Sequence, residues 1–294
     1  MTKRVTTVGD ALLARLAAQA EVLAALEPAV RADEPDAVHR MRVACRRLRS
    51  ALRTYRRLLA AGPARDLATE AKWLGAALGQ ARDHEVLRER LLAAARELPA
   101  ECEPQRTAER LTAWSEREYR RAWPEVVDAL DSPRHRAFTE ALDRLLADPP
   151  LRGRARRPAG PELARIAARE QRRTAVRVRR ALATGAGPER DLALHEARKA
   201  AKRARYAGET AKPVAGRPAE RYTERMKAVQ DALGEHQDAV VAAGALHTLA
   251  ENGGPDAFVF GVLYGGQLAA AARAREELPG AWARAAKRKL SRLA

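Results

Sequence analysis

Apolar residues recur at spacings of three and four along most of this chain, with polar or charged residues between them. In residues 38–59, one side of a helical wheel carries the apolar positions Met41, Ala44, Leu48, Ala51, Leu52, Tyr55 and Leu59. A period of 3.6 residues is typical of amphipathic α-helices. Helix-favouring alanine, leucine, arginine and glutamate dominate, and clusters of β-branched or aromatic residues are scarce. The pattern therefore predicts an all-α protein.

Proline and glycine divide the helical segments. Turn signals occur at 27–28, 34–35, 62–63, 99–104, 132–133, 185–188, 213–218, 253–255 and 279–280. The densest group of helix breakers, from Asp148 to Pro161, lies near the middle of the chain. It predicts a linker between an N-terminal half, residues 1–150, and a C-terminal half, residues 151–294. Each half holds about four long helices, which is enough for a four-helix bundle.

The sequence of a cationic helix occurs twice in the chain. The first copy begins at His39 with the pattern H-x-x-R-x-x-x-R-R-x-R, and the second begins at His195 with H-x-x-R-K-x-x-K-R-x-R-Y. Each copy is followed by a segment L-G-x-x-x-D, which ends at Asp83 or Asp238. The two histidines are 156 residues apart and the two aspartates 155. Two motifs that keep nearly one offset indicate a duplicated unit, and duplication predicts a two-fold-like arrangement of paired basic faces.

On a helical wheel the first copy gathers its basic side chains within an arc of roughly 100°. These are His39, Arg42, Arg46, Arg49, Arg53 and Arg56. The second copy aligns His195, Arg198, Lys202 and Arg205, but Glu209 stands where the first copy has Arg53. Like charges at this spacing destabilise a helix unless something anionic lies along them. The alternative is a solvated face balanced by acids of neighbouring helices. The repetition favours an anion-binding face.

The segments that end in the aspartates supply further candidates. Each carries a lysine, a glycine and an aspartate down one helix face: Lys72, Gly79 and Asp83 in the first copy, Lys227, Gly234 and Asp238 in the second. We expect the lysines to reach the same anion and the glycines to permit close helix packing. The aspartates are candidates to fix the histidine tautomers by accepting a hydrogen bond from the ring. An ion pair is the alternative role for each aspartate.

The charge of the chain agrees with an anionic partner. The formal net charge is +17, and residues 152–180 alone contain eleven arginines and two glutamates. We assign this tract to the electrostatic attraction of a polyanion. Only two cysteines occur, so neither a disulfide framework nor a zinc cluster is expected. No metal site is expected at the histidines, because the fourth residue after each is Val43 or Lys199.

Nothing in the sequence pattern favours a membrane protein. Residues 1–10 lack the apolar region of a signal peptide, and the most apolar run, 257–272, is shorter than the roughly 20 residues that span a bilayer. We expect this run to be a buried bundle helix, with a membrane anchor as the much less favoured alternative, and the protein to be soluble and cytoplasmic.

The paired motifs resemble those of the CHAD family, the conserved histidine α-helical domain. The resemblance covers both halves and implies two four-helix bundles related by a pseudo-two-fold axis, with a basic groove or channel between them. It also implies binding of inorganic polyphosphate and association with polyphosphate granules. The implied phosphate contacts are His39, Arg42, Arg46, Arg49, Lys72, His195, Arg198, Lys202, Arg205 and Lys227, to which we add Arg53 and Arg82. One departure is Gln237, which replaces the arginine that would match Arg82.

Three functions are weighed against these observations. The leading one is a binding module for polyphosphate or a similar linear polyanion, with no cofactor. Nucleic-acid binding is the alternative, although Tyr206 is the only aromatic residue near the basic rows and no base-reading motif is present. An enzyme such as a polyphosphatase is least expected, because no P-loop or carboxylate cluster suited to Mg²⁺ is recognisable. Oligomeric state does not follow from the sequence.

Overall fold

The computed structural model describes residues 5–252, 254–287, 290 and 293. Its α-helices are α1 (Val8–Arg31), α2 (Ala37–Thr54), α3 (Ala61–Arg96), α4 (Pro104–Asp131), α5 (Pro133–Ala147), α6 (Ala159–Ala183), α7 (Pro188–Asn252) and α8 (Ala257–Ala285). Short 3₁₀ turns lie at Ala100–Cys102, Gly153–Arg156 and Gly254–Asp256. Within the described part of the chain no strand forms, and only two isolated bridges occur. The all-α prediction is confirmed.

Helix α7 is two helical limbs joined by a sharp turn. Gly216 lies at φ 49° and ψ −130°, a backbone conformation that is essentially restricted to glycine. The predicted break at 213–218 therefore reverses the chain, and the limbs 188–215 and 217–252 pack against each other. The limbs come close at Gly208, where a Cβ would lie 2.5 Å from Thr223 Oγ1 and 2.6 Å from the Tyr222 ring. Counted by limbs over the described residues, the second half has four α-helices, whereas the first has five.

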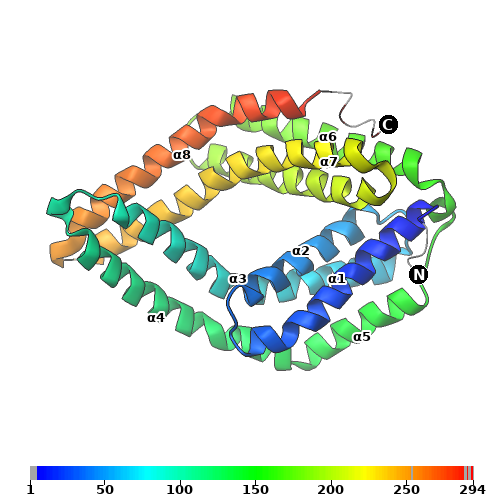
Figure 1. Ribbon diagram of the computed structural model, residues 1–294, viewed down its shortest axis with the longest axis horizontal. Coiled ribbons are helices and arrows are strands. Elements are labelled where there is room, and N and C mark those ends of the chain that lie inside the picture. The colour runs from blue at the N-terminus through cyan, green and yellow to red at the C-terminus, as the bar shows by residue number, and fades with distance from the viewer. Residues whose placement is uncertain (1–4, 253, 288–289, 291–292, 294) are drawn as a thin grey trace.

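The helices surround an elongated oval (Figure 1). Helices α1–α5 form one long side, and α6–α8 form the other. Consecutive helices pack on one another in both halves: α1 on α2, α2 on α3 and α3 on α4, then α6 on α7 and α7 on α8. Helix α2 and the first limb of α7 carry the two cationic motifs, and both lie along the middle of the oval. Direct contacts between α2 and α7 join the halves there.

The two halves are also joined at both ends of the oval. At one end, apolar side chains of α3 and α4 pack on those of α7 and α8 in a separate small core, which includes Leu87, Leu91, Leu111, Leu246, Phe260 and Leu263. At the other end, the start of α1 pairs with the segment before α6: Val8 donates a backbone hydrogen bond to Arg157, and Ala159 donates one to Thr6. The larger core runs without interruption from α1 through α2 and α6 to α7.

Helix α8 differs from expectation. We predicted that its apolar run would be buried, but only one stripe is covered, because α8 packs mainly against α7. The opposite face leaves Phe258 73% exposed and Leu268 47% exposed. By length and composition alone the segment Gly254–Ala285 is apolar enough to cross a bilayer, and 33% of its most apolar stretch is buried. The apolar run is therefore a partly covered surface helix in this fold.

Candidate functional site

Four basic side chains from the two motifs meet in the middle of the molecule. We call Arg42 and Arg46 of α2 together with Arg198 and Lys202 of α7 the central cluster. Arg42 and Arg198 are equivalent in the two repeats, as are Arg46 and Lys202. Helix α2 is joined to α7 directly, since Arg46 Nε donates a 2.8 Å hydrogen bond to the Tyr206 hydroxyl. The two cationic rows therefore converge, as the duplication predicted.

The lowered pKa of Lys202 reflects the burial and the concentration of positive charge in the central cluster. Burial, together with the nearby guanidinium groups of Arg198, Arg46 and Arg42, lowers the pKa of the Lys202 ammonium to about 7, against the opposing effect of Asp238. Among the described residues no carboxylate lies within ion-pair distance of Lys202 or Arg46. The buried Nε of Arg198 also finds no hydrogen-bond partner in the described chain. An anion entering the cluster would satisfy these groups.

The two aspartates hold arginines rather than histidines. Arg42 donates to Asp83 at 2.6 Å, and the equivalent Arg198 lies 3.3 Å from Asp238. The expectation that these carboxylates orient His39 and His195 is therefore wrong, and the interhelical ion pair left as the alternative is correct. Both pairs stay partly exposed, so each aspartate aims a guanidinium without burying it.

The glycines of the second motif leave room for those same arginines. A Cβ on Gly79 would lie 3.4 Å from the Arg42 guanidinium, and one on Gly234 would lie 3.2 Å from that of Arg198. We expected the glycines to bring helix backbones together. Instead each guanidinium lies over the helix that carries its aspartate, where a Cβ would already touch it and a longer side chain would displace it.

The histidines at the start of the rows have unlike neighbours. Burial lowers the pKa of His39, and Arg82, Arg46 and Arg42 add to the effect, so its ring is neutral at pH 7. In the second half, His195 Nδ1 lies 3.0 Å from the Gln237 amide oxygen and carries the proton of that hydrogen bond. Gln237 thus replaces the repulsive Arg82 with a hydrogen-bond acceptor. Arg82 itself is held by Glu85 at 2.9 Å.

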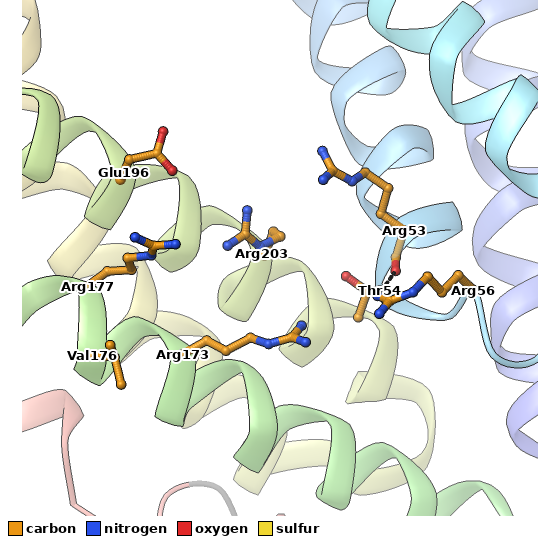
Figure 2. Close-up of a pocket in the computed structure, with 8 residues that line it drawn as sticks. All are labelled: Arg53, Thr54, Arg56, Arg173, Val176, Arg177, Glu196 and Arg203. Carbon is orange, nitrogen blue, oxygen red and sulfur yellow. Dashed lines mark hydrogen bonds between the residues drawn. The ribbon is translucent and has the colours of Figure 1, made fainter.

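Beyond the central cluster, the row on α2 continues into a pocket between the two halves. This pocket of about 620 Å³ is lined by five arginines together with Thr54, Val176 and Glu196. We call it the arginine pocket; its arginines are Arg53, Arg56, Arg173, Arg177 and Arg203. Figure 2 shows Arg53 of α2 and Arg56 of the turn that follows α2, opposite the arginines of α6 and α7. A second pocket on the other flank of α2, about 540 Å³, brings Lys72 beside Arg49 and Arg53.

Three of these arginines were not singled out from the sequence. Arg173 and Arg177 lie in the arginine-rich tract 152–180, whose individual contacts sequence could not assign. Arg203 is the repeat equivalent of Arg47, one position outside the face that the helical wheel selected. The sequence gives their spacing along α6 and α7, but it does not predict which helix they face across the pocket.

Two further predicted contacts, Lys227 and Arg205, are paired with carboxylates outside the central cluster. Lys227 pairs with Asp231 at 2.6 Å on the exposed surface of its own helix and lines none of the described pockets. Arg205 lies 3.4 Å from Glu209 and stacks over the Tyr206 ring at 4.8 Å. Among the described residues, no group of three or more His, Cys, Asp or Glu side chains is placed to hold a metal ion.

Comparison with known proteins shows what this architecture is similar to. Two relatives from Mycobacterium tuberculosis, uncharacterized protein MT2285 of strain CDC 1551 and uncharacterized protein Rv2226 of strain H37Rv, are each 35% identical over 270 residues. The matches cover 90% of this chain, which spans about half the length of either relative.

Solved structures agree with the fold. The CHAD domain from the plant Ricinus communis superposes with a TM-score of 0.75 at 27% identity, covering 96% of this chain and 92% of that one. PptA from Streptomyces chartreusis superposes with a TM-score of 0.77 at 24% identity, covering 94% and 99%, which supports the fold alone. A family model described as the CHAD domain matches residues 14–247, which include both cationic motifs. The chain belongs to the CHAD domain family.

Proposed function

We propose that this protein binds inorganic polyphosphate, or a linear polyanion of the same chemistry, in the central cluster. The observation that carries the proposal is the meeting of Arg42, Arg46, Arg198 and Lys202, where burial and the neighbouring guanidinium groups lower the pKa of the lysine to about 7. Family membership supports it, because the resemblance to CHAD proteins implies polyphosphate as the ligand.

The energetics favour a polymer over a single phosphate. Each exposed ion pair contributes only about 0–1 kcal/mol. Contacts to one flexible chain add up without a new association cost, so ten of them reach micromolar affinity or better. Arginine suits this task because its planar fork donates two parallel hydrogen bonds to phosphate oxygens.

Nucleic acid fits the site less well. Stacking on aromatic side chains is a main source of affinity for single strands. The Tyr206 ring is 4% exposed and one face is occupied by Arg205, so it offers no platform for a base. Calorimetric titrations with polyphosphates of graded length, triphosphate and single-stranded DNA test the ranking. Displacement of polyphosphate by DNA at equal phosphate concentration would reverse it.

We further propose that the protein acts by binding and does not turn the polymer over, and that it works in the cytoplasm at polyphosphate granules. A fluorescent fusion that stays diffuse in granule-containing cells would contradict the second statement. Release of phosphate from polyphosphate with added divalent cations would contradict the first.

Affinity for long-chain polyphosphate is expected to fall about tenfold between pH 6 and pH 8, with most of the loss above pH 7. Bound phosphate favours the ammonium form of Lys202, whose pKa in the free protein is about 7. Above that pH the free lysine is neutral, so binding must first take up a proton. In Lys202→Arg the guanidinium stays charged. Its affinity should therefore be flat over the same range, and an equally steep profile in the variant would refute the assignment.

Replacing Gly234 with leucine is expected to weaken polyphosphate binding several-fold without lowering the melting temperature. A leucine side chain would displace the Arg198 guanidinium, which lies 3.2 Å from the Cβ position, while removing a helix-interior glycine favours the helix by about 1 kcal/mol. Gly244→Leu is the matched control, because it lies on the same limb of α7 with nothing within 4 Å of its Cβ position. Equal binding by the two variants would show that the guanidinium position is unimportant.

A further inference from the structure

The two cationic rows are equivalent in sequence position but not in available charge. On the α7 side the row ends at Glu209, whose side chain is 13% exposed. Glu209 lies 2.5 Å from Arg15, 3.3 Å from Arg47 and 3.4 Å from Arg205. Three arginines from α1, α2 and α7 therefore share one largely covered carboxylate. Beyond Tyr206, the basic side chains at this end of the row are therefore ion-paired with Glu209.

On the α2 side the charge stays available. Arg53 stands at the position equivalent to Glu209, and none of the described carboxylates is within ion-pair distance of Arg49 or Arg53. Burial lowers the pKa of Arg49, and the charges of Arg53 and Arg203 lower it further. This row leads out of the central cluster toward the arginine pocket. From Arg46 to Arg53 it covers about 10 Å at 1.5 Å per residue.

The acids around the arginine pocket do not cancel it. Glu170 is 1% exposed and lies near Arg169, Arg173 and Arg203, at 3.2, 2.8 and 3.8 Å. Glu196 lines the pocket, but its carboxylate pairs with Lys199 at 2.6 Å. Burial lowers the pKa of Arg203, and Arg53 and Arg173 act in the same direction while Glu170 opposes them. Five guanidinium groups, four from three helices and one from the turn after α2, thus face one space with few carboxylates to balance them.

We infer that the arginine pocket is a second phosphate subsite, and that a bound polyanion leaves the central cluster on one side only, along α2 and through this pocket. The inference rests on the proposed function. It specifies the direction in which the polyphosphate runs. It also assigns Arg173 and Arg177, the two arginines that α6 contributes to the pocket, to contacts with the outer part of a long polyphosphate. Short oligophosphates occupy the central cluster alone.

The test compares Arg173→Gln/Arg177→Gln with a matched pair on the same helix, Arg172→Gln/Arg179→Gln. Both pairs remove two charges, all four arginines are exposed, and Arg172 and Arg179 line none of the described pockets. Each variant is titrated with triphosphate and with long-chain polyphosphate, and circular dichroism checks its helicity. The pocket variant is expected to bind long-chain polyphosphate about tenfold more weakly and triphosphate as wild type does. The control is expected to match wild type with both ligands.

The possible outcomes distinguish failure of the second subsite from failure of the proposed polyphosphate binding. If the pocket variant and the control bind long-chain polyphosphate equally, the second subsite is wrong while the central cluster stands. If the pocket variant weakens triphosphate binding as much as that of the long polymer, the pocket is the primary site and the one-sided path is again wrong. If the wild-type protein binds neither ligand, the proposed function itself fails.

Discussion

The double substitution Arg46→Glu/Lys202→Glu is expected to abolish retention of long-chain polyphosphate while leaving the helices intact. Arg46 and Lys202 are equivalent in the two repeats and lie within reach of each other's charge. Losing two charge-assisted contacts removes about 3–6 kcal/mol, which is at least a hundredfold in affinity, before any repulsion from the new carboxylates. Glutamate is a good helix former, and the new carboxylates would face Arg42 and Arg198, so the fold is preserved.

The measurement is retention on immobilised polyphosphate, followed by calorimetric titration. Arg172→Glu/Arg179→Glu changes the net charge by the same amount at exposed positions of α6 and is the control for general electrostatics. If the control loses as much affinity as the central variant, binding is governed by overall charge, and the site assignment is wrong. If the central variant binds as wild type does, the central cluster is not the site.

A second expected result has opposite signs for stability and for binding. Glu209→Gln should lower the free energy of unfolding by about 3 kcal/mol, because it leaves Arg15, Arg47 and Arg205 without their buried partner. The same change should strengthen polyphosphate binding, since the freed arginines extend the second row and would open a second exit from the central cluster. The ligand would then restore much of the lost melting temperature.

Thermal unfolding with and without long-chain polyphosphate measures both effects together. The comparison is Glu251→Gln, an exposed glutamate near the end of α7 whose described partner is His247. A Glu209 variant that is destabilised and also binds more weakly would show that the carboxylate supports the site instead of restricting it. Unchanged stability would show that the three arginines do not depend on Glu209.

Much of this arrangement could be predicted from sequence because duplication preserves position. The shared offset identified Arg42 with Arg198 and Arg46 with Lys202, and a helical wheel gave the face on which each lies. What a wheel does not give is the reach of a side chain across to another helix. That is why Asp83 was assigned to a histidine when it holds Arg42, and why Arg15 of α1 was not seen beside Glu209.

The remaining differences have similar physical causes. The role of Gly79 depends on a guanidinium that folds back over it from α2, a contact between segments far apart in sequence. The exposure of α8 depends on the number of neighbouring helices, since apolar composition alone does not distinguish a helix covered on all sides from one covered by a single partner. The numbers of helices in the two halves differ because, among the described residues, α5 of the first half has no counterpart in the second.

Because the two halves contact each other at both ends of the oval, they are expected to depend on each other for stability. A unit that folds on its own needs a separate core. Here the main core is continuous between the halves, the small core at the tips of α3 and α8 draws on both, and the backbone pairing of Val8 with Arg157 ties the opposite end. If one repeat unfolded alone, it would therefore expose apolar surface of the other. We therefore expect the two repeats to unfold as one cooperative unit, and the proposed polymer site to lie in a frame that is joined at both ends.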